Sequence, residues 1–310
     1  MKPILITGYV NPDLDAVAGA IAYCELLQKT GKSAVTGIIG EMHDEAKYIL
    51  NRYNFEYPKS IPNADNFDEV ILVDASDPIG IDGKIEPEKV IEIIDHRKIN
   101  EADKFPNAKA QIELVGSAST LIVERFIQNN IDISYQSAVL LCGAIISNTL
   151  NFKAGVTTER DRKAVEYLNK VALLPDNFWK ELFMAKSDLS GGKLRERIEG
   201  DFAWFVMGDK KVGIAQIEMI GADKLIKERI DDITKVLEEI KSKMKLDYIF
   251  QNTIGLEEGK NFFIAQDVKT QALLEKVFGI KFNGFVAERP NLMMRKQIVP
   301  LIKEELEKAV

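Results

Sequence analysis

The sequence predicts an α/β protein in which a parallel-sheet domain is followed by a smaller α/β domain with a mixed sheet. In the first half, short β-branched runs alternate with amphipathic segments, which is the rhythm of a parallel sheet with crossover helices. After a break rich in Ser and Gly, paired strands and long charged helices take over. We therefore expect a first domain over residues 1–186, a linker over 187–194 and a second domain over 195–310.

In the first domain, the expected strands are short apolar or β-branched runs at 4–7, 33–39, 70–73 and 90–94. The expected helices span 16–28, 45–53, 116–129, 138–149, 157–171 and 180–186. Ser117 and Ser119 are suitable capping residues for the start of the third helix, and we favour this interpretation. The less favoured interpretation is that this helix start binds an anion such as phosphate. In a parallel sheet the carboxyl ends of the strands lie along one edge, where open α/β sheets bind ligands.

In the second domain, two strands at 204–207 and 212–219 are joined by a turn at 208–211, which predicts a hairpin. A long amphipathic helix is expected over 222–244, and a shorter one over 269–278. Further strands are expected at 246–252 and 261–266, and a final helix from Leu301. These elements fit a domain of about a hundred residues, a common domain size.

The composition limits the class of protein. The net charge of −7 over 310 residues argues against a nucleic acid polymer or a membrane surface as the main partner. No apolar run approaches the length of a membrane span. Cys24 and Cys142 lie in apolar helical patterns, so we expect buried, reduced thiols and a cytoplasmic location. A homodimer is compatible with the sequence, although no residue pattern requires one.

Acidic residues follow three of the predicted strands. Asp13 and Asp15 lie where the first strand gives way to a helix, Asp74 follows the strand at 70–73, and Asp95 with His96 follows the strand at 90–94. Asp13 also suits a turn or a helix cap. Carboxylate oxygens with an imidazole suit Mn²⁺ or Mg²⁺, ions that activate water and polarise phosphoryl groups. The sequence therefore predicts a divalent-metal site at this edge.

The same residues resemble a known family. The run Asn11-Pro12-Asp13-x-Asp15, the strand-terminal Asp74, and Asp95-His96 look like the first three motifs of the DHH phosphoesterase superfamily. The resemblance is greatest to the manganese-dependent (family II) inorganic pyrophosphatases, and it continues through residues 115–120, 144–153, 208–216 and 295–300. It implies a DHH-type metal domain followed by a DHHA2-type domain that clamps the substrate.

The resemblance also implies roles for individual residues. Asp74 would bridge two divalent ions, one held also by Asp13 and the other held also by Asp15 and His96. The second domain would clamp the phosphates of a small substrate through its basic residues, which are Arg295 and Lys296 with Lys210 or Lys211. Such a clamp would exclude water and orient a small polyanion.

Three positions depart from the family pattern. Tyr9 replaces a histidine, Arg97 replaces the second histidine of the Asp-His-His triplet, and Asn148 replaces an aspartate. A neutral phenol is a poor ligand for Mn²⁺, and the changes move the local charge by about two units toward positive. A single bound ion is therefore compatible with this sequence. The Arg97 guanidinium can instead bind phosphate bidentately.

These observations predict a metal-dependent phosphohydrolase of inorganic pyrophosphatase type, in which an activated water attacks the phosphorus of a phosphoanhydride such as pyrophosphate. Arg97, Arg295 and Lys296 would stabilise charge on the phosphoryl oxygens. One alternative is a DHH hydrolase of short polyphosphate or a nucleotide phosphate. The other is a catalytically silent protein that binds phosphate or a nucleotide on the same scaffold.

Overall fold

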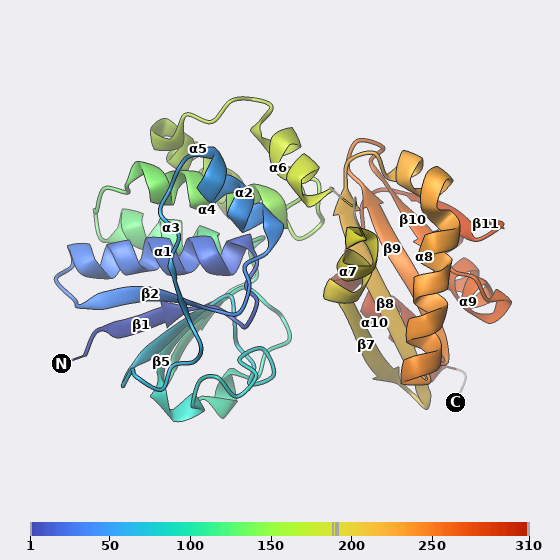
Figure 1. The fold of residues 1–310 in the computed structure, drawn as a ribbon, viewed down its shortest axis with the longest axis horizontal. Coiled ribbons are helices and arrows are strands. Elements are labelled where there is room, and N and C mark those ends of the chain that lie inside the picture. Colours follow the sequence, from blue (N-terminus) through green and yellow to red (C-terminus); the bar gives the residue numbers. More distant parts are fainter. Residues whose placement is uncertain (1, 188, 190–191, 309–310) are drawn as a thin grey trace. The chain divides into compact units, whose positions relative to one another are not determined.

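The structure, a computed structural model, describes residues 2–187, 189 and 192–308 (Figure 1). The chain divides into two compact units, Met1–Ala185 and Lys186–Val310. Three residues of the predicted linker (188, 190 and 191) lie outside the described residues. Helix α7 (Lys193–Gly200) begins within the range predicted for the linker.

The first unit contains a six-stranded sheet in the order β3-β2-β1-β4-β5-β6, and every neighbouring pair is parallel. The predicted parallel sheet is confirmed. Its strands are β1 (Ile4–Thr7), β2 (Ala34–Ile39), β3 (Lys59–Ile61), β4 (Val70–Val73), β5 (Val90–Asp95) and β6 (Lys109–Ile112). The sequence did not predict β3 or β6, because these edge strands are short and carry exposed Lys, Ser and Ala.

The helices of the first unit are α1 (Leu14–Lys29), α2 (Asp44–Arg52), α3 (Ala118–Gln128), α4 (Tyr135–Asn148), α5 (Glu159–Ala172) and α6 (Phe178–Lys186). Helices α1 and α3 pack on one face of the sheet, and α4 and α5 pack in turn on them (Figure 1). The opposite face is covered by the segments that follow β3, β4 and β5, including the 3-10 helix Ala102–Lys104. All four residues of β4 are buried, as expected for a central parallel strand.

The second unit has a mixed sheet in the order β11-β12-β10-β9-β8-β7, in which only β8 and β9 pair in parallel. Its strands are β7 (Phe202–Met207), β8 (Lys210–Met219), β9 (Tyr248–Gly255), β10 (Lys260–Ile264), β11 (Phe282–Asn283) and β12 (Val286–Pro290). The predicted hairpin is confirmed, with β7 and β8 in register from Phe202–Ala215 to Met207–Lys210.

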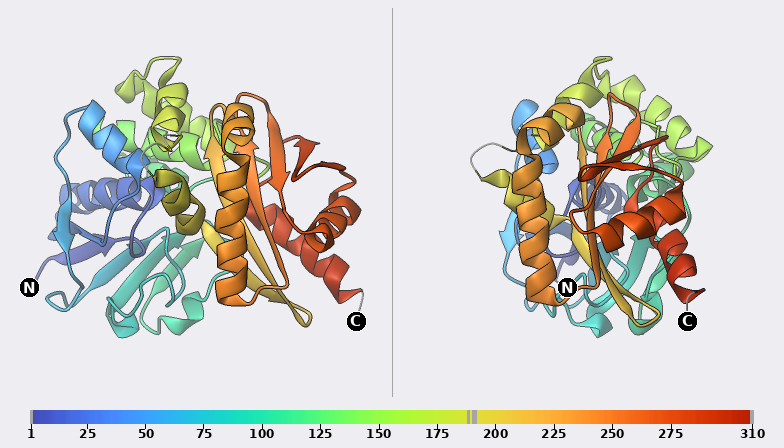
Figure 2. Two further views of the ribbon diagram at one scale, coloured as in Figure 1. Left: turned by 45° about the vertical axis from the view of Figure 1, so that its right-hand side comes forward. Right: turned by 90° about the vertical axis from the view of Figure 1, so that its right-hand side faces the viewer.

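Helices cover both faces of this sheet (Figure 2). One apolar core joins α7 and α8 (Ala222–Met244) to the sheet, and a second joins α9 (Val268–Phe278) and α10 (Arg295–Glu307) to the other face. The predicted start of the last helix at Leu301 was wrong, because α10 begins at Arg295 and continues through Pro300. Pro300 is exposed, so its ring does not disturb the packed face of the helix.

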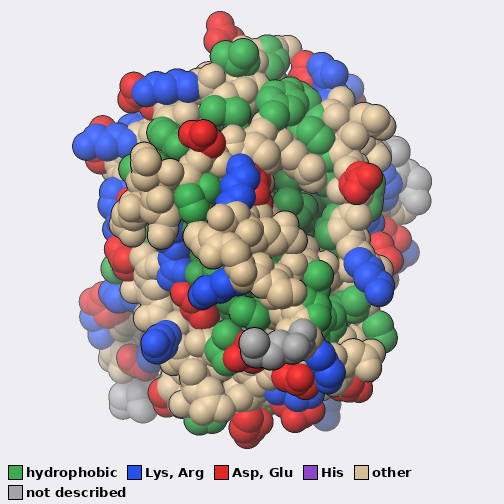
Figure 3. All heavy atoms as spheres, turned by 90° about the vertical axis from the view of Figure 1, so that its left-hand side faces the viewer, with side chains coloured by type: hydrophobic (Ala, Val, Ile, Leu, Met, Phe, Trp, Pro, Cys, Tyr) green, Lys and Arg blue, Asp and Glu red, His purple; other side chains and the backbone are tan. Residues whose placement is uncertain are grey.

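None of the helices in the described residues combines the length and the apolar character that a membrane span requires. On the face shown in Figure 3, acidic and basic side chains are interspersed and neither sign forms a broad patch.

Candidate metal and phosphate site

The site lies where three neighbouring strands of the first sheet end. Strand β1 leads into the loop before α1, β4 ends one residue before Asp74, and β5 ends at Asp95. Asp74 has a left-handed backbone (φ 56°), a conformation that Asp tolerates better than most residues, while its N–H still donates to Ile94 O at 2.8 Å. The turn directs the Asp74 side chain across the edge of the sheet, where the side chains of Asp15 and His96 also lie.

Three of the four predicted ligands come together in one cluster of the described residues, and Asp13 is not part of this cluster. The His96 Nε2 atom lies 3.4 Å from Asp74 Oδ1 and 3.8 Å from Asp15 Oδ2. One ligand atom from each of the three residues falls within 4.8 Å of the other two. The side chains are 0% (Asp15), 3% (Asp74) and 9% (His96) exposed. Two carboxylates and an imidazole in this arrangement can hold one divalent cation.

The hydrogen bonding of His96 shows that the three residues fit a metal ion. Its Nδ1 lies 3.0 Å from the backbone oxygen of Val115, which can only accept, so Nδ1 carries the proton. In the neutral imidazole, Nε2 then presents its lone pair to the two carboxylates, which are also acceptors. Three acceptors that face one another in this way suit a cation between them. A backbone carbonyl that fixes the tautomer in this way is the usual partner of a metal-ligating histidine.

Asp15 is held by donors from two helices. At the start of α3 it accepts hydrogen bonds from Ser117 Oγ, Ala118 N, Ser119 N and Ser119 Oγ, at 2.6–2.9 Å. Asn148 Nδ2 at the end of α4 donates to Asp15 Oδ2 at 2.7 Å. Ser117 is the N-cap of α3, as predicted. Burial, followed by the nearby charge of Asp74, raises the pKa of Asp15 even though His96 and the serines lower it.

Asp95 supports the site without facing the cluster. Its Oδ2 accepts a short hydrogen bond from Ser76 Oγ, and its Oδ1 accepts from His96 N at 2.6 Å and from Arg97 N at 3.3 Å. Asp95 is fully buried, and burial together with the charge of Asp74 raises its pKa. These contacts fix the backbone from which the side chains of His96 and Arg97 project.

Arg97 lies on the other side of Asp74. Its Nη2 donates to the Asp74 backbone oxygen at 2.7 Å and lies 3.5 Å from Asp74 Oδ2, while its Nη1 lies 3.5 Å from Asp77 Oδ2. The guanidinium carbon is 5.5 Å from the centre of the Tyr9 ring. Burial lowers the pKa of Arg97, but Asp74 and Asp95 outweigh burial and hold it above its ordinary value. The group therefore stays charged, and its side chain is 34% exposed.

Asp13 and Tyr9 complete this side of the site. Asp13 is the N-cap of α1, and its Oδ1 accepts from Ala16 N at 3.1 Å, so the cap interpretation is confirmed. Tyr9 Oη accepts from Asp13 N at 3.1 Å. Burial raises the pKa of Tyr9 well above its usual value, and the phenol remains neutral. Burial also raises the pKa of Asp13, and so do the charges of Asp74, Glu45 and Asp15.

The sequence analysis missed Glu45. This buried carboxylate accepts from Leu14 N at 3.3 Å and from Ser147 Oγ at 2.5 Å, so it connects α2 to the start of α1 and to the end of α4. An acid in the first turn of a helix is ordinary, and the sequence therefore gives no sign that this one faces the site. Glu45 adds to the negative charge around Asp13.

The structure places the predicted basic clamp in the second unit at two ends of the β7–β8 hairpin. Arg295 at the start of α10 pairs with Asp201 Oδ1 at 2.6 Å and donates to the Asp201 backbone oxygen at 2.7 Å. Lys210 pairs with Asp209, and Lys211 Nζ lies 5.7 Å from the centre of the Trp204 ring. The hairpin therefore does not bring either lysine together with Arg295. Lys296 follows Arg295 on α10 and is exposed.

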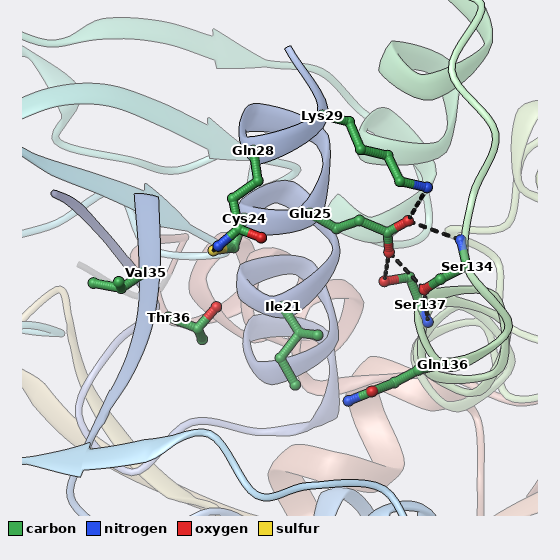
Figure 4. Close-up of a pocket in the computed structure, with 10 residues that line it drawn as sticks. All are labelled: Ile21, Cys24, Glu25, Gln28, Lys29, Val35, Thr36, Ser134, Gln136 and Ser137. Carbon is green, nitrogen blue, oxygen red and sulfur yellow. Dashed lines mark hydrogen bonds and ion pairs between the residues drawn. The ribbon is translucent and has the colours of Figure 1, made fainter. Parts of the chain in front are cut away.

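A separate hollow of about 500 Å³ lies between the C-terminal half of α1, β2 and the start of α4 (Figure 4). Its one acidic side chain, Glu25, accepts hydrogen bonds from Ser134 N, Ser134 Oγ and Ser137 Oγ and pairs with Lys29. Glu25 thus caps α4, and none of the residues that line the hollow belongs to the acidic cluster.

Comparison with known proteins identifies the family. Residues 3–145 match the DHH family N-terminal domain, and residues 180–305 match the DHHA2 domain. The chain is 30% identical over 306 residues to a probable manganese-dependent inorganic pyrophosphatase of Clostridium acetobutylicum, with 98% of each chain covered. The chain belongs to this pyrophosphatase family, within the DHH superfamily. A Bacillus mycoides relative with the same name is 31% identical over 314 residues, covering 98% of this chain and 99% of the relative.

Solved structures agree with this assignment to the pyrophosphatase family. A Methanococcus jannaschii protein named as a family II inorganic pyrophosphatase superposes with a TM-score of 0.78 at 28% identity, covering 98% of this chain and 99% of that chain. An exopolyphosphatase-related protein from Bacteroides fragilis shares the fold alone, with a TM-score of 0.51 at 14% identity over 99% and 92% of the two chains. The family assignment makes this chain a phosphohydrolase of pyrophosphatase-like type.

Proposed function

We propose that this protein hydrolyses a small phosphoanhydride such as pyrophosphate in a reaction that depends on a divalent ion, Mn²⁺ or Mg²⁺. The observation that carries the proposal is the convergence of Asp15, Asp74 and His96, with the His96 proton directed away to Val115. The names of the relatives support manganese and pyrophosphate as the first choices to test.

Each residue of the site has a chemical role in this proposal. A divalent ion would be held by Asp15, Asp74 and His96, and it would supply positive charge to the phosphoryl oxygens and lower the pKa of the attacking water. Arg97 is partly exposed, and to the other described residues its guanidinium makes one hydrogen bond shorter than 3.5 Å, so its other N–H groups can bind phosphoryl oxygens. Asp13 has a raised pKa and can accept the proton of the attacking water.

The second unit supplies further positive charge in this proposal. Lys296 is exposed at the first turn of α10, where backbone N–H groups and the helix dipole also favour an anion. Arg295 fixes the start of that helix through its contacts with Asp201. We assign Arg295 two roles, which are to add positive charge for the phosphates and to orient Lys296. Lys210 and Lys211 are the weaker candidates for phosphate contact, because the hairpin separates them from Arg295.

The decisive assay is phosphate release by metal-stripped protein from pyrophosphate, tripolyphosphate and a nucleoside triphosphate, with and without Mn²⁺ or Mg²⁺. We expect metal-dependent release that Asp74→Asn abolishes. Asp176→Asn, an exposed carboxylate of the same unit, is the matched control and should leave the rate unchanged. Release from the longer substrates alone would transfer the assignment to a polyphosphate or nucleotide hydrolase.

A second candidate function rests on the Tyr9–Arg97 pair. A fixed guanidinium stacked near a phenol binds phosphate without any metal, which is the chemistry of a silent phosphate-binding protein. Calorimetric binding of pyrophosphate by the metal-stripped protein, combined with no release in any of the assays above, would favour this function over the hydrolase.

A further inference from the structure

We propose that the Arg97 guanidinium occupies the place of a second divalent cation, so that each chain binds one divalent ion instead of two. This inference deepens the proposed function, because it concerns how the same site supplies positive charge. It rests on contacts of Arg97, Asp74 and Tyr9, and its test requires no turnover.

The carboxylate of Asp74 faces two cation positions. Its Oδ1 lies 3.4 Å from His96 Nε2, on the side of the three-ligand cluster. Its other oxygen, Oδ2, lies 3.5 Å from Arg97 Nη2. The oxygen that would bridge to a second ion is therefore already next to a fixed positive charge. A divalent ion entering there would be repelled by the guanidinium.

Of the other two residues at that second position, Asp13 already caps α1 through its Oδ1, and Tyr9 does not fit a metal ion. Tyr9 Oη already accepts the Asp13 N–H at 3.1 Å, and a neutral phenol brings no charge. The Tyr9 ring instead offers its face to the guanidinium, whose carbon lies 5.5 Å from the ring centre, within the range of a cation–π contact. Tyr9 and Arg97 thus act as a pair, since the aromatic ring helps to hold the cation that displaces the ion.

Oxygen atoms from the loop after β4 and from the end of β5 hold Arg97 in this place. The guanidinium contacts the Asp74 backbone oxygen at 2.7 Å, Asp77 Oδ2 at 3.5 Å and Asp95 Oδ1 at 3.8 Å. Two of these residues, Asp74 and Asp77, follow β4, and Asp95 is the last residue of β5. The fold itself therefore positions the guanidinium. The three-ligand position of Asp15, Asp74 and His96 stays available for one divalent ion.

The test is the metal content of the protein in the absence of substrate. Metal-stripped protein is titrated with Mn²⁺ by calorimetry, and the bound metal is counted by mass spectrometry after removal of free ion. We expect one ion per chain and the electron paramagnetic resonance spectrum of an isolated Mn²⁺. The double variant Tyr9→His with Arg97→His should bind two ions and give the spectrum of a coupled pair.

Arg160→His is the matched control. Arg160 also pairs with two carboxylates of the first unit, Glu113 and Glu124, but lies outside the site, so its variant should still bind one ion. Two ions in the unmodified protein, or one ion in a folded double variant, would overturn the inference. If the double variant does not fold, the count in the unmodified protein alone decides. One bound ion without phosphate release would support the inference and contradict the proposed function. Two bound ions with phosphate release would contradict the inference and support the proposed function.

Discussion

Asn148→Asp should destabilise the metal-free protein and increase the stabilisation that Mn²⁺ provides. Asn148 Nδ2 donates to Asp15 Oδ2 at 2.7 Å, and Asp15 is fully buried. The substitution replaces that donor with a carboxylate oxygen facing a buried carboxylate. Losing a hydrogen bond to a charged group costs about 1.5–3 kcal/mol, and the new repulsion adds to this cost. We therefore expect a loss of about 2 kcal/mol or more in the free energy of unfolding without metal.

The expected change in melting temperature follows from the size of the unit. For a domain of 150–250 residues, 1 kcal/mol corresponds to about 2–4 °C. The first unit, Met1–Ala185, falls in this range, so the metal-free melting temperature should fall by about 4–8 °C. A bound divalent ion reverses the repulsion, since the new carboxylate becomes a further ligand. The rise in melting temperature on adding Mn²⁺ should therefore be larger in the variant than in the unmodified protein.

The assay is thermal unfolding of metal-stripped protein with and without saturating Mn²⁺ at neutral pH. Asn66→Asp is the matched control, because Asn66 lies in an exposed turn of the same unit and the substitution makes the same change of charge. The control should move the melting temperature by much less. An unchanged or raised metal-free melting temperature in Asn148→Asp, or a smaller Mn²⁺ shift, would refute the assigned contact between Asn148 and Asp15.

Three further predictions test other parts of the account. Asp161→Ala should lower the free energy of unfolding of the first unit by about 3 kcal/mol or more in chemical unfolding. Asp161 accepts hydrogen bonds from Gly116 N, Thr120 Oγ1 and Thr158 N, and each buried donor left without its acceptor costs about 1–3 kcal/mol. A loss under about 1 kcal/mol would contradict this role. Burial raises the pKa of Cys142 to about 12, so its thiol should not react with a disulfide reagent at pH 8 until the protein is unfolded, and rapid native labelling would be the contrary result. Arg295→Ala should weaken pyrophosphate binding while the Mn²⁺ affinity stays nearly constant, and equal loss of both affinities would argue against separate roles for the two units.

The positions of the site residues could be predicted because they depend on local order along the chain. Asp74 and Asp95 close apolar runs, and parallel strands bring their carboxyl ends to one edge. The geometry of Arg97 could not be predicted in the same way. The sequence shows only that a permanently charged arginine replaces the histidine of the family pattern. The contact with Asp74 and the stacking near Tyr9 depend on how three loops fold over the edge of the sheet.

The role of Glu45, the start of α10 and the edge strands could not be predicted from the sequence, each for a different physical reason. The role of Glu45 depends on its contacts with Leu14 and Ser147, residues far away along the chain, and local pattern carries no information about such packing. The start of α10 at Arg295 was missed because a proline usually marks a helix boundary, while Pro300 lies exposed inside this helix. The edge strands β3 and β6 lack the apolar alternation that reveals a strand.

The most direct test of the central claim is the anomalous diffraction of manganese in crystals soaked with Mn²⁺. The account predicts a single strong peak within ligand distance of Asp15, Asp74 and His96, beside an Arg97 guanidinium that remains against Asp74. No peak at these residues would contradict the metal site itself. A second peak of similar height between Asp13 and Asp74, with Arg97 displaced, would contradict the assignment of the guanidinium as the second cation.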